Sequence, residues 1–358
     1  MKILVANPFG IGDVIFSTPL LEELKRNYPA SYIGYVCNKR AYEVIKSNPN
    51  INKIFVYEKD DFRATWKVSK NEFFKKLFKF LKLVKSERFD IAIDLSLNYQ
   101  CSLCLMLIGL PNRVGFNYRK RGKFLTRRID IDGFSDKHVV EYYLDTIKLM
   151  GMSSAPSGSR PRVYITETDR LWARQFLANY MVDDKDLVVG VIPGCGASWG
   201  VDARHRRWNL EGFAKVCDAL VEKRKAIVIL LGDAQEAVLG EKLQKLMKHN
   251  AIVACGKTTI GDFLGIVKRC NLVITNDGGP LHMAVGVGTK TVSIFGPVDE
   301  KIYGPYPGDS DHVVVSKKNL PCRPCYRKFK YSICERRECL DTITPEDVLD
   351  AVDKVLAK

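Results

Sequence analysis

The sequence predicts an α/β protein built from two domains, each with a parallel sheet covered by helices. Short apolar runs alternate along the chain with segments of helical periodicity, which is the pattern of repeated βαβ units. The chain has 358 residues, more than a single hydrophobic core usually supports. Residues 152–161 are rich in serine, proline and glycine, as linkers are, and we therefore expect the domain boundary there.

Composition and charge narrow the class of protein. Apolar residues make up 46% of the chain and charged residues 27%, and no apolar run approaches the ~20 residues that span a bilayer. Residues 1–8 are typical of a first strand rather than of a signal peptide, so we expect a cytoplasmic protein with mostly reduced cysteines. The formal charge is +15, and residues 1–150 hold 26 Lys and Arg against 16 Asp and Glu. This balance favours an anionic partner: nucleic acid, lipid or a phosphorylated substrate.

The first half opens with an expected strand at residues 2–7. The turn Phe9–Val14 follows, and then a helical pattern that ends at Tyr28 before Pro29. Asp13 lies at the start of this helix, where an acid serves either as an N-cap or as a functional group at the carboxyl edge of the sheet. Further strands are expected at Tyr32–Cys37, Ile54–Tyr57, Phe89–Leu95 and Arg113–Phe116.

Two basic segments follow in the first half. Residues 71–88 predict a helix with lysines on one face and phenylalanines and leucines on another. Such a helix either lies in an anionic membrane interface or crosses over the sheet with solvated lysines outside, and the two interpretations partly coexist. The second segment, residues 118–123 with Arg127 and Arg128, is expected to be a loop that receives an anionic acceptor or is simply solvated.

The second half predicts strands at Leu187–Ile192, Ala226–Leu231, Ala251–Ala254, Leu272–Thr275 and Thr291–Phe295. The glycine-rich loop 193–200 follows the first of these strands, and the basic segment 204–209 comes next. Together they are typical of a phosphate site. The loop lacks the Walker A and G-x-G-x-x-G patterns, so neither a P-loop NTPase nor an NAD enzyme is supported. We expect Trp208 to be a core residue.

The segment Thr275–Ala284 turns from a buried strand directly into a helix. Its two glycines allow a ligand to approach the backbone, and Pro280 suits the first turn of a helix. Free N–H groups and the helix dipole at such a turn attract an anion, and a diphosphate would fit. An ordinary strand–turn–helix corner is the alternative, and the presence of Asp277 and His282 favours the anion site.

The C-terminal part contains a cysteine-rich tail and a final helix. Cys322, Cys325, Cys334 and Cys339 have the pattern C-x2-C-x8-C-x4-C, which could form a zinc site. The second pair is not spaced as in a zinc ribbon and the intervening loop is basic, so zinc binding stays open. The residues Thr344–Asp347 provide an N-cap, a proline and an acid for a helix that runs through Val355.

Taken together, these motifs resemble the ADP-heptose:lipopolysaccharide heptosyltransferases and their relatives, glycosyltransferase family 9. The resemblance covers almost the whole chain. It rests on Gly10–Val14 with Thr18–Leu20, His138, Pro193–Gly194, Arg206–Trp208, Asn276–His282, Phe295–Pro297 and the cysteine-rich tail. It implies the GT-B fold, with two Rossmann-like domains facing across a cleft. Residues 1–152 would then form the acceptor-binding domain, 163–340 the nucleotide-sugar-binding domain, and 341–358 a helix returning to the first domain.

The resemblance also implies a reaction. A family member moves a heptose from ADP-heptose to the lipopolysaccharide inner core with inversion, without a metal or other cofactor. Asp13 would be the base that takes the proton of the acceptor hydroxyl. Arg206 and the backbone N–H groups of Gly278 and Gly279 would bind the leaving diphosphate, Asp277 the sugar, and His282 the phosphate or the turn itself. Further implied donor contacts are Gly194, Ser198, Glu236 and Thr258, and implied acceptor contacts are Gly12, Arg119, Lys120 and Arg121.

The implied partners are the nucleotide sugar and an anionic lipopolysaccharide precursor, with peripheral contact to the inner face of the inner membrane and no nucleic acid. Two positions depart from well-known members, which have Ser-Ser where this chain has Phe9-Gly10 and Thr or Ser where it has Gly278. A related enzyme for another ADP- or GDP-sugar is therefore an alternative. A nucleotide-sugar epimerase is a further one, disfavoured by Asp13. A basic nucleic-acid-binding protein is the last, although no such motif is seen.

Overall fold

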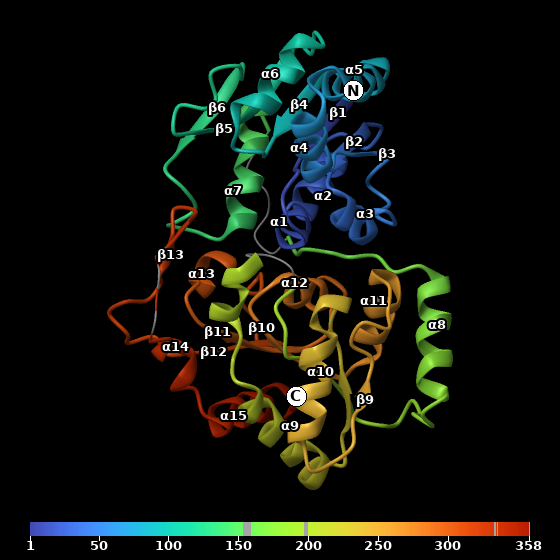
Figure 1. Ribbon diagram of the computed structural model, residues 1–358. Helices are drawn as coiled ribbons and strands as arrows, with labels where there is room; N and C mark the ends of the chain where they lie inside the picture. Colours follow the sequence, from blue (N-terminus) through green and yellow to red (C-terminus); the bar gives the residue numbers. More distant parts are fainter. Residues whose placement is uncertain (153–158, 197–199, 333, 335, 358) are drawn as a thin grey trace. The chain divides into compact units, whose positions relative to one another are not determined.

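The computed structural model describes residues 1–152, 159–196, 200–332, 334 and 336–357 (Figure 1). The chain divides into two compact units, Met1–Pro161 and Arg162–Lys358. Each contains a six-stranded sheet in which all pairings are parallel, so the α/β fold class predicted from the sequence is confirmed. Among the described residues, no helix is long and apolar enough to cross a membrane.

The first sheet has the strand order β3-β2-β1-β4-β5-β6. Its strands are β1 Lys2–Ala6, β2 Tyr32–Cys37, β3 Lys53–Val56, β4 Ile91–Asp94, β5 Asn112–Tyr118 and β6 Arg127–Ile131. The chain builds the sheet outward from β1 to β3 and then crosses back to place β4 beside β1. The strand order therefore reverses between β1 and β4, which is where open α/β sheets bind ligands.

The helices of the first unit are α1 Ile11–Phe16, α2 Thr18–Asn27, α3 Lys39–Ile45, α4 Lys59–Val68, α5 Lys70–Ser86, α6 Tyr99–Leu107, α7 Val139–Asp145 and the 3-10 helix η1 Thr146–Met150. The sequence predicts one helix up to Tyr28, but the structure divides it at Ser17. Pro19 has no N–H for the carbonyl of Ile15, and the Thr18 hydroxyl donates to that carbonyl instead at 2.8 Å. The short helix α1 is thus a separate turn that carries Asp13.

The two basic segments differ from their expected extents. The segment 71–88 belongs to a pair of helices, because Ser69 ends α4 and caps α5 by accepting from the backbone N–H of Glu72. Arg127 and Arg128 are not in a loop. They open β6, whose Val114↔Arg127 pairing places it at the edge of the sheet, where charged side chains are common.

The second sheet has the order β12-β11-β10-β7-β8-β9, with β7 Val188–Ile192, β8 Ile227–Leu230, β9 Ile252–Val253, β10 Leu272–Asn276, β11 Thr291–Phe295 and β12 His312–Ser316. Here the strand order reverses between β7 and β10. The sequence predicts no strand at β12, because its apolar run, Val313–Val315, is too short to give a clear signal. The helices are α8 Glu167–Ala178, η2 Gly200–Arg206, α9 Leu210–Arg224, η3 Ala234–Glu236, α10 Ala237–Leu246, α11 Ile260–Arg269, α12 Gly279–Gly286, α13 Glu300–Tyr303, α14 Glu338–Asp341 and α15 Pro345–Leu356.

The C-terminal helix α15 begins with the expected capping box, in which Thr344 and Asp347 satisfy each other's backbone N–H groups. Its apolar side chains Val348, Val352 and Val355 are fully buried in the core that α9 and the second sheet share. We therefore assign α15 to the second unit, which corrects the expectation that residues 341–358 return to the first domain. The valines repeat at the spacing of one helix face, and that face is occupied within the second unit.

Candidate functional site

Asn276 joins three segments at the carboxyl edge of the second sheet. It is the last residue of β10 and is completely buried. Its Nδ2 donates to the carbonyl oxygens of Pro193 at 2.9 Å and Gly194 at 3.0 Å, and its Oδ1 accepts from the backbone N–H of Trp208 at 2.9 Å. The loop after β7 and the segment after η2 are thereby fixed to β10. Asn276 is part of the motif Asn276–His282 but received no role from the sequence, although a polar side chain ending a buried strand requires partners.

Arg206 and Asp277 form a buried ion pair beside this junction. The Asp277 Oδ2 atom accepts from Arg206 Nη2 at 2.7 Å and Nε at 3.1 Å, and the two residues are only 7% and 1% exposed. Burial raises the pKa of the Asp277 carboxyl, while the guanidinium of Arg206 opposes this by favouring the carboxylate. The other oxygen, Oδ1, is buried without a hydrogen-bond partner among the described residues. The pair thus places Asp277 Oδ1, a buried oxygen that can accept a hydrogen bond, beside the guanidinium group of Arg206.

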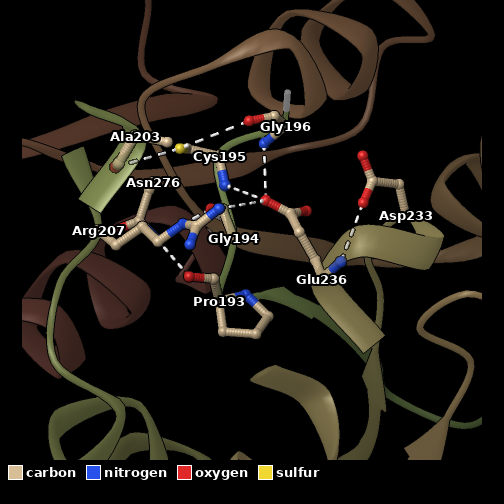
Figure 2. A network of polar contacts seen from close by, with 9 residues as sticks. All are labelled: Pro193, Gly194, Cys195, Gly196, Ala203, Arg207, Asp233, Glu236 and Asn276. Atoms are coloured by element: carbon tan, nitrogen blue, oxygen red, sulfur yellow. Dashed lines mark hydrogen bonds and ion pairs between the residues drawn. The ribbon is translucent and has the colours of Figure 1, made fainter. Parts of the chain in front are cut away.

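Glu236 organises the loop after β7 in the same way (Figure 2). Its Oε1 accepts from the backbone N–H groups of Cys195 at 2.9 Å and Gly196 at 3.0 Å, and from Arg207 Nη2 at 3.2 Å. Its Oε2 is buried and lacks a hydrogen-bond partner within the described chain. A Cβ atom at Gly194 would lie 2.1 Å from the Glu236 carboxylate carbon, so only glycine permits this approach. The consecutive arginines Arg206 and Arg207 therefore each pair with a carboxylate, and these two carboxylates follow different strands of the sheet.

The turn into α12 has the predicted construction, with Pro280 in the first helical turn. A Cβ atom at Gly278 would lie 2.2 Å from the carbonyl oxygen of Cys195, so the turn closes directly on the loop after β7. Close packing against Cys195 therefore explains why glycine, rather than Ser or Thr, occupies position 278. Gly279 is the first residue of α12, and His282 is buried one turn further along.

One implied donor contact, Thr258, lies elsewhere. Thr258 is half-buried and precedes Thr259, which caps α11 at the carboxyl end of β9. Ser198 falls outside the described residues. The structure therefore gathers Gly194, Arg206, Glu236, Asp277 and Gly278 in one network, while Thr258 lies in the segment after β9, the outermost strand of the sheet.

The cysteine-rich tail supports the arginine segment. Trp208 is a core residue, as predicted, and its Nε1 donates to the carbonyl of Ile343 at 3.1 Å. Arg337 Nη2 donates to the carbonyl of Arg207 at 2.7 Å. The backbone N–H of Cys325 donates to the carbonyl of Pro297 at 2.9 Å. These contacts connect the tail, the turn after β11 and the ion-paired arginines into one framework.

Among the described residues, the four tail cysteines do not form a recognisable metal site. Within the part of the chain that the structure describes, no group of three or more His, Cys, Asp or Glu side chains is arranged to hold a metal ion. Cys339 is buried, and burial with the neighbouring thiols raises its pKa to about 11, whereas Cys322 is exposed. Zinc binding by these cysteines gains no support from the geometry.

In the first unit, Asp13 lies in the first turn of α1 at the carboxyl end of β1. The N-cap of α1 is Gly10, so Asp13 is not the capping residue. Asn7 Nδ2 donates to the carbonyl of Asp13 at 3.0 Å, and Asn38 Nδ2 donates to the carbonyl of Phe9. The turn is thus held from two sides, and the partly buried Asp13 is presented at the point where the strand order reverses.

Two further residues surround this turn. His138 caps α7, with its Nδ1 accepting from the backbone N–H of Val140, and its ring packs edge-on to Phe16 of α1 at 5.0 Å. Asp94 ends β4 and pairs in register with Ala6. Its carboxyl is buried, and burial raises its pKa although Ser96 donates to it from the backbone at 2.9 Å. Asp94 was not selected from the sequence, because one acid within an apolar run carries no signal of its own.

The implied acceptor contacts lie on the same edge of the first sheet. Gly12 directly precedes Asp13 in α1. Arg119, Lys120 and Arg121 form the exposed loop after β5, and the guanidinium groups of Arg119 and Arg121 lie 5.0 and 5.7 Å from the ring centre of the buried Tyr118. This loop is a cationic surface two strands away from β1.

Comparison with known proteins connects these features. A model of glycosyltransferase family 9 (heptosyltransferase) matches residues 77–332. Lipopolysaccharide heptosyltransferase 3 of Escherichia coli is 22% identical, with 96% of each chain covered. The structure of a glycosyltransferase family 9 protein of Veillonella parvula is 25% identical with a TM-score of 0.83, and 100% of this chain and 98% of that chain are covered. The E. coli heptosyltransferase WaaC, solved with ADP-2-deoxy-2-fluoro heptose, is 13% identical with a TM-score of 0.71 and 99% of both chains covered.

Proposed function

The chain belongs to glycosyltransferase family 9, and we propose that it is an inverting heptosyltransferase that moves a heptose from ADP-heptose to the lipopolysaccharide inner core. Its Rossmann-like units are those of the GT-B fold, which the Veillonella parvula protein of the same family shares. The observation that carries the proposal is the buried Arg206–Asp277 pair beside the start of α12, where strand order reverses in the second unit.

The second unit supplies the chemistry for a nucleotide sugar. The N–H groups at the start of α12 and its dipole attract the diphosphate, and Arg206 adds a cation beside them. The Asp277 Oδ1 atom is suited to accept from a sugar hydroxyl, and the Glu236 Oε2 atom from a hydroxyl of the nucleoside. His282 and Thr258 remain proposed donor contacts. The bound ADP-sugar analogue of E. coli WaaC supports this choice of ligand.

The proposed reaction is a single displacement. The acceptor hydroxyl oxygen attacks the anomeric carbon, the bond from that carbon to the diphosphate oxygen breaks, and ADP leaves with the electron pair. The Asp13 carboxylate takes the proton of the attacking hydroxyl, and attack from the face opposite the leaving group inverts the configuration. Arg206 and the start of α12 stabilise the charge that develops on the diphosphate, so we propose that no divalent metal takes part.

The first unit is proposed to bind the acceptor. Arg119, Lys120 and Arg121 would contact the anionic lipopolysaccharide precursor. Gly12, which has no side chain, would leave room for the acceptor hydroxyl to approach Asp13. Because such an acceptor is lipid-linked, we place the reaction at the cytoplasmic side of the inner membrane.

One observation favours a second candidate. Because Gly278 has no side chain and closes on Cys195, the turn offers no hydroxyl group beside Asp277. A family member that uses another ADP- or GDP-sugar is therefore the alternative function.

Nucleotide binding distinguishes these functions. In a thermal-shift and calorimetric series, ADP and ADP-heptose should raise the Tm of the second unit, whereas GDP, UDP and their sugars should not. Arg206→Ala should weaken ADP-heptose binding by at least about tenfold, since charge-assisted contacts contribute ~1.5–3 kcal/mol. Arg204→Ala removes the same charge from an exposed neighbour and is the matched control. Preference for GDP-sugars would favour the alternative, and indifference to all nucleotides would refute both.

A further inference from the structure

The helices α4 and α5 expose an unusual group of large apolar side chains. The exposed fractions are 44% for Trp66, 88% for Val68, 45% for Phe74 and 68% for Phe78. Phe74 and Phe78 are four residues apart in α5 and therefore project from the same side of the helix. The ring of Trp66 in α4 lies 6.0 Å from that of Phe74, so the group continues across both helices. Trp66, Phe74 and Phe78 are called the aromatic patch below.

The hydrophobic core of the first unit does not require these side chains. The opposite face of α5 is already packed: Val84 is 2% exposed and lies in the core with Phe80, and Phe73 and Phe80 contact the ring of Phe62. This confirms the crossover-helix interpretation for one face only. The aromatic patch is on the other face, so it needs a separate explanation.

Lysines surround the aromatic patch. Residues 66–86 contain seven lysines and one acid, Glu72. Lys75, Lys82 and Lys85 lie three residues before, four after and seven after Phe78, and these spacings place them on its side of the helix. All three are exposed, and Lys70 Nζ lies 5.6 Å from the ring centre of Trp66. An apolar centre with a cationic rim is thus exposed on one helical pair, α4 and α5, which Figure 1 labels in the first unit.

We propose that the aromatic patch and its lysines form a docking surface for an anionic lipid bilayer. Lysines attract the anionic headgroups, while Phe78 and Phe74 enter the boundary between headgroups and acyl chains. Tryptophan is favoured at that depth because its ring is apolar and its N–H is polar. Docking through this surface would hold the first unit, to which Asp13 and the Arg119–Arg121 loop belong, at a membrane that carries a lipid-linked acceptor. The inference concerns binding alone and stands without the proposed reaction.

Other occupants fit less well. A second copy of the chain in a two-fold contact would bring the same lysines of α5 against each other, and their like charges would repel. A polynucleotide would satisfy the lysines, but Val68 and Leu83 have no hydrogen-bonding group and no ring to stack on a base. Hydrocarbon with anionic headgroups satisfies both parts of the surface.

Vesicle binding tests the proposal. The full chain is sedimented with vesicles of phosphatidylcholine alone or of phosphatidylcholine mixed with the anionic lipid phosphatidylglycerol. Binding is expected only to the anionic vesicles. Replacing Lys75, Lys82 and Lys85 with Gln should lower the affinity at least tenfold, since each lysine near the surface is worth roughly fivefold. Gln at Lys223, Lys242 and Lys245, exposed in the second unit, removes the same charge and should leave binding unchanged.

A second variant separates insertion from charge. Phe74→Ser with Phe78→Ser should lower affinity by at least about tenfold, because the lost apolar burial is that of two phenylalanine side chains. The control is Leu171→Ser with Val238→Ser, whose side chains are similarly exposed, at 56% and 57%. The substituted side chains are exposed in both variants, so we expect an unchanged Tm. An unchanged Tm establishes that each variant is folded.

Trp66 gives a direct measure of depth, because it is the single tryptophan of residues 1–161. Lipids brominated on the upper acyl chain should quench part of the tryptophan fluorescence, and Trp66→Phe should abolish that part. Equal binding to neutral and anionic vesicles, unchanged affinity of both α5 variants, quenching that persists in Trp66→Phe, or preference for polynucleotide over the vesicles would each overturn the proposal.

Discussion

The buried Arg206–Asp277 pair leads to a quantitative prediction. The Arg206 Nη2 atom and the Asp277 Oδ2 atom are 2.7 Å apart, and both side chains are at least nine-tenths buried. Removing one partner leaves the other charge buried and unpaired, which costs about 3–5 kcal/mol. In a unit of about 200 residues, 1 kcal/mol corresponds to ~2–4 °C in Tm, so Arg206→Ala or Asp277→Ala should lower the Tm of the second unit by roughly 6–20 °C.

The double variant is the decisive member of this series. With both partners removed neither charge of this pair is left buried and unpaired, so its loss should be smaller than the sum of the single losses by about 3 kcal/mol. Unfolding is followed by tryptophan fluorescence in a Trp66→Phe background, because the other tryptophans, at positions 172, 199 and 208, all belong to the second unit. The control cycle uses Arg224 and Asp353, an exposed pair at 2.6 Å whose coupling should stay below about 1 kcal/mol. Additive losses at Arg206 and Asp277 would refute the reasoning.

Three further predictions concern other parts of the second unit. Gly194→Ala should lower both Tm and ADP-heptose affinity, because its Cβ atom would displace Glu236, while Gly308→Ala, whose Cβ meets nothing within 4 Å, should be neutral; equal effects would contradict the close approach. The hydrogen bond from Lys317 holds the pKa of Asp347 below its usual value, with a further contribution from the Thr344 backbone N–H. A depressed pKa in the folded state stabilises at neutral pH, and this stabilisation is lost as the pH falls below about 4, so Asp347→Asn should reduce the loss of Tm between pH 6 and pH 3. The exposed Cys322 should react with a thiol reagent in the native protein, whereas Cys217, Cys255 and Cys270, whose burial raises their pKa to about 12, should react only after unfolding; mass spectrometry of the labelled protein distinguishes these sites.

The sheet and its strand ends could be predicted because parallel strands buried on both faces have a strong local signal. The turn at Gly278–Pro280 could likewise be predicted, because glycine and proline favour particular positions in turns and at the starts of helices. Asp277 follows such a strand directly and Asp13 lies in the first turn of the helix after one, so their place at the sheet edge could be read from sequence order.

Contacts between distant segments could not be predicted in this way. The pairing of Asp277 with Arg206, and the three hydrogen bonds of Asn276, join residues that are about 70 to 80 positions apart. From the sequence, Arg206 was predicted to bind the diphosphate and Asp277 the sugar, whereas in the structure the two residues form one ion pair. The placement of α15 was wrong because an apolar helix face does not identify its partner.

The two sides of α5 illustrate a related limit. Periodicity separates an apolar stripe from a basic one, but Phe74 and Phe78 belong to the outer side although their residue type suggests the inner one. Only the positions of the neighbouring strands decide which phenylalanines are buried.

Acceptor-dependent release of ADP tests the central claim most directly. The purified protein is supplied with ADP-heptose and a heptose-deficient inner-core acceptor, and the wild-type chain is compared with Asp13→Asn. We predict that the variant binds ADP-heptose with a Kd within about twofold of the wild type, while its turnover falls by at least about a hundredfold, the range expected for loss of a general base. Turnover by Asp13→Asn close to that of the wild type would contradict the account.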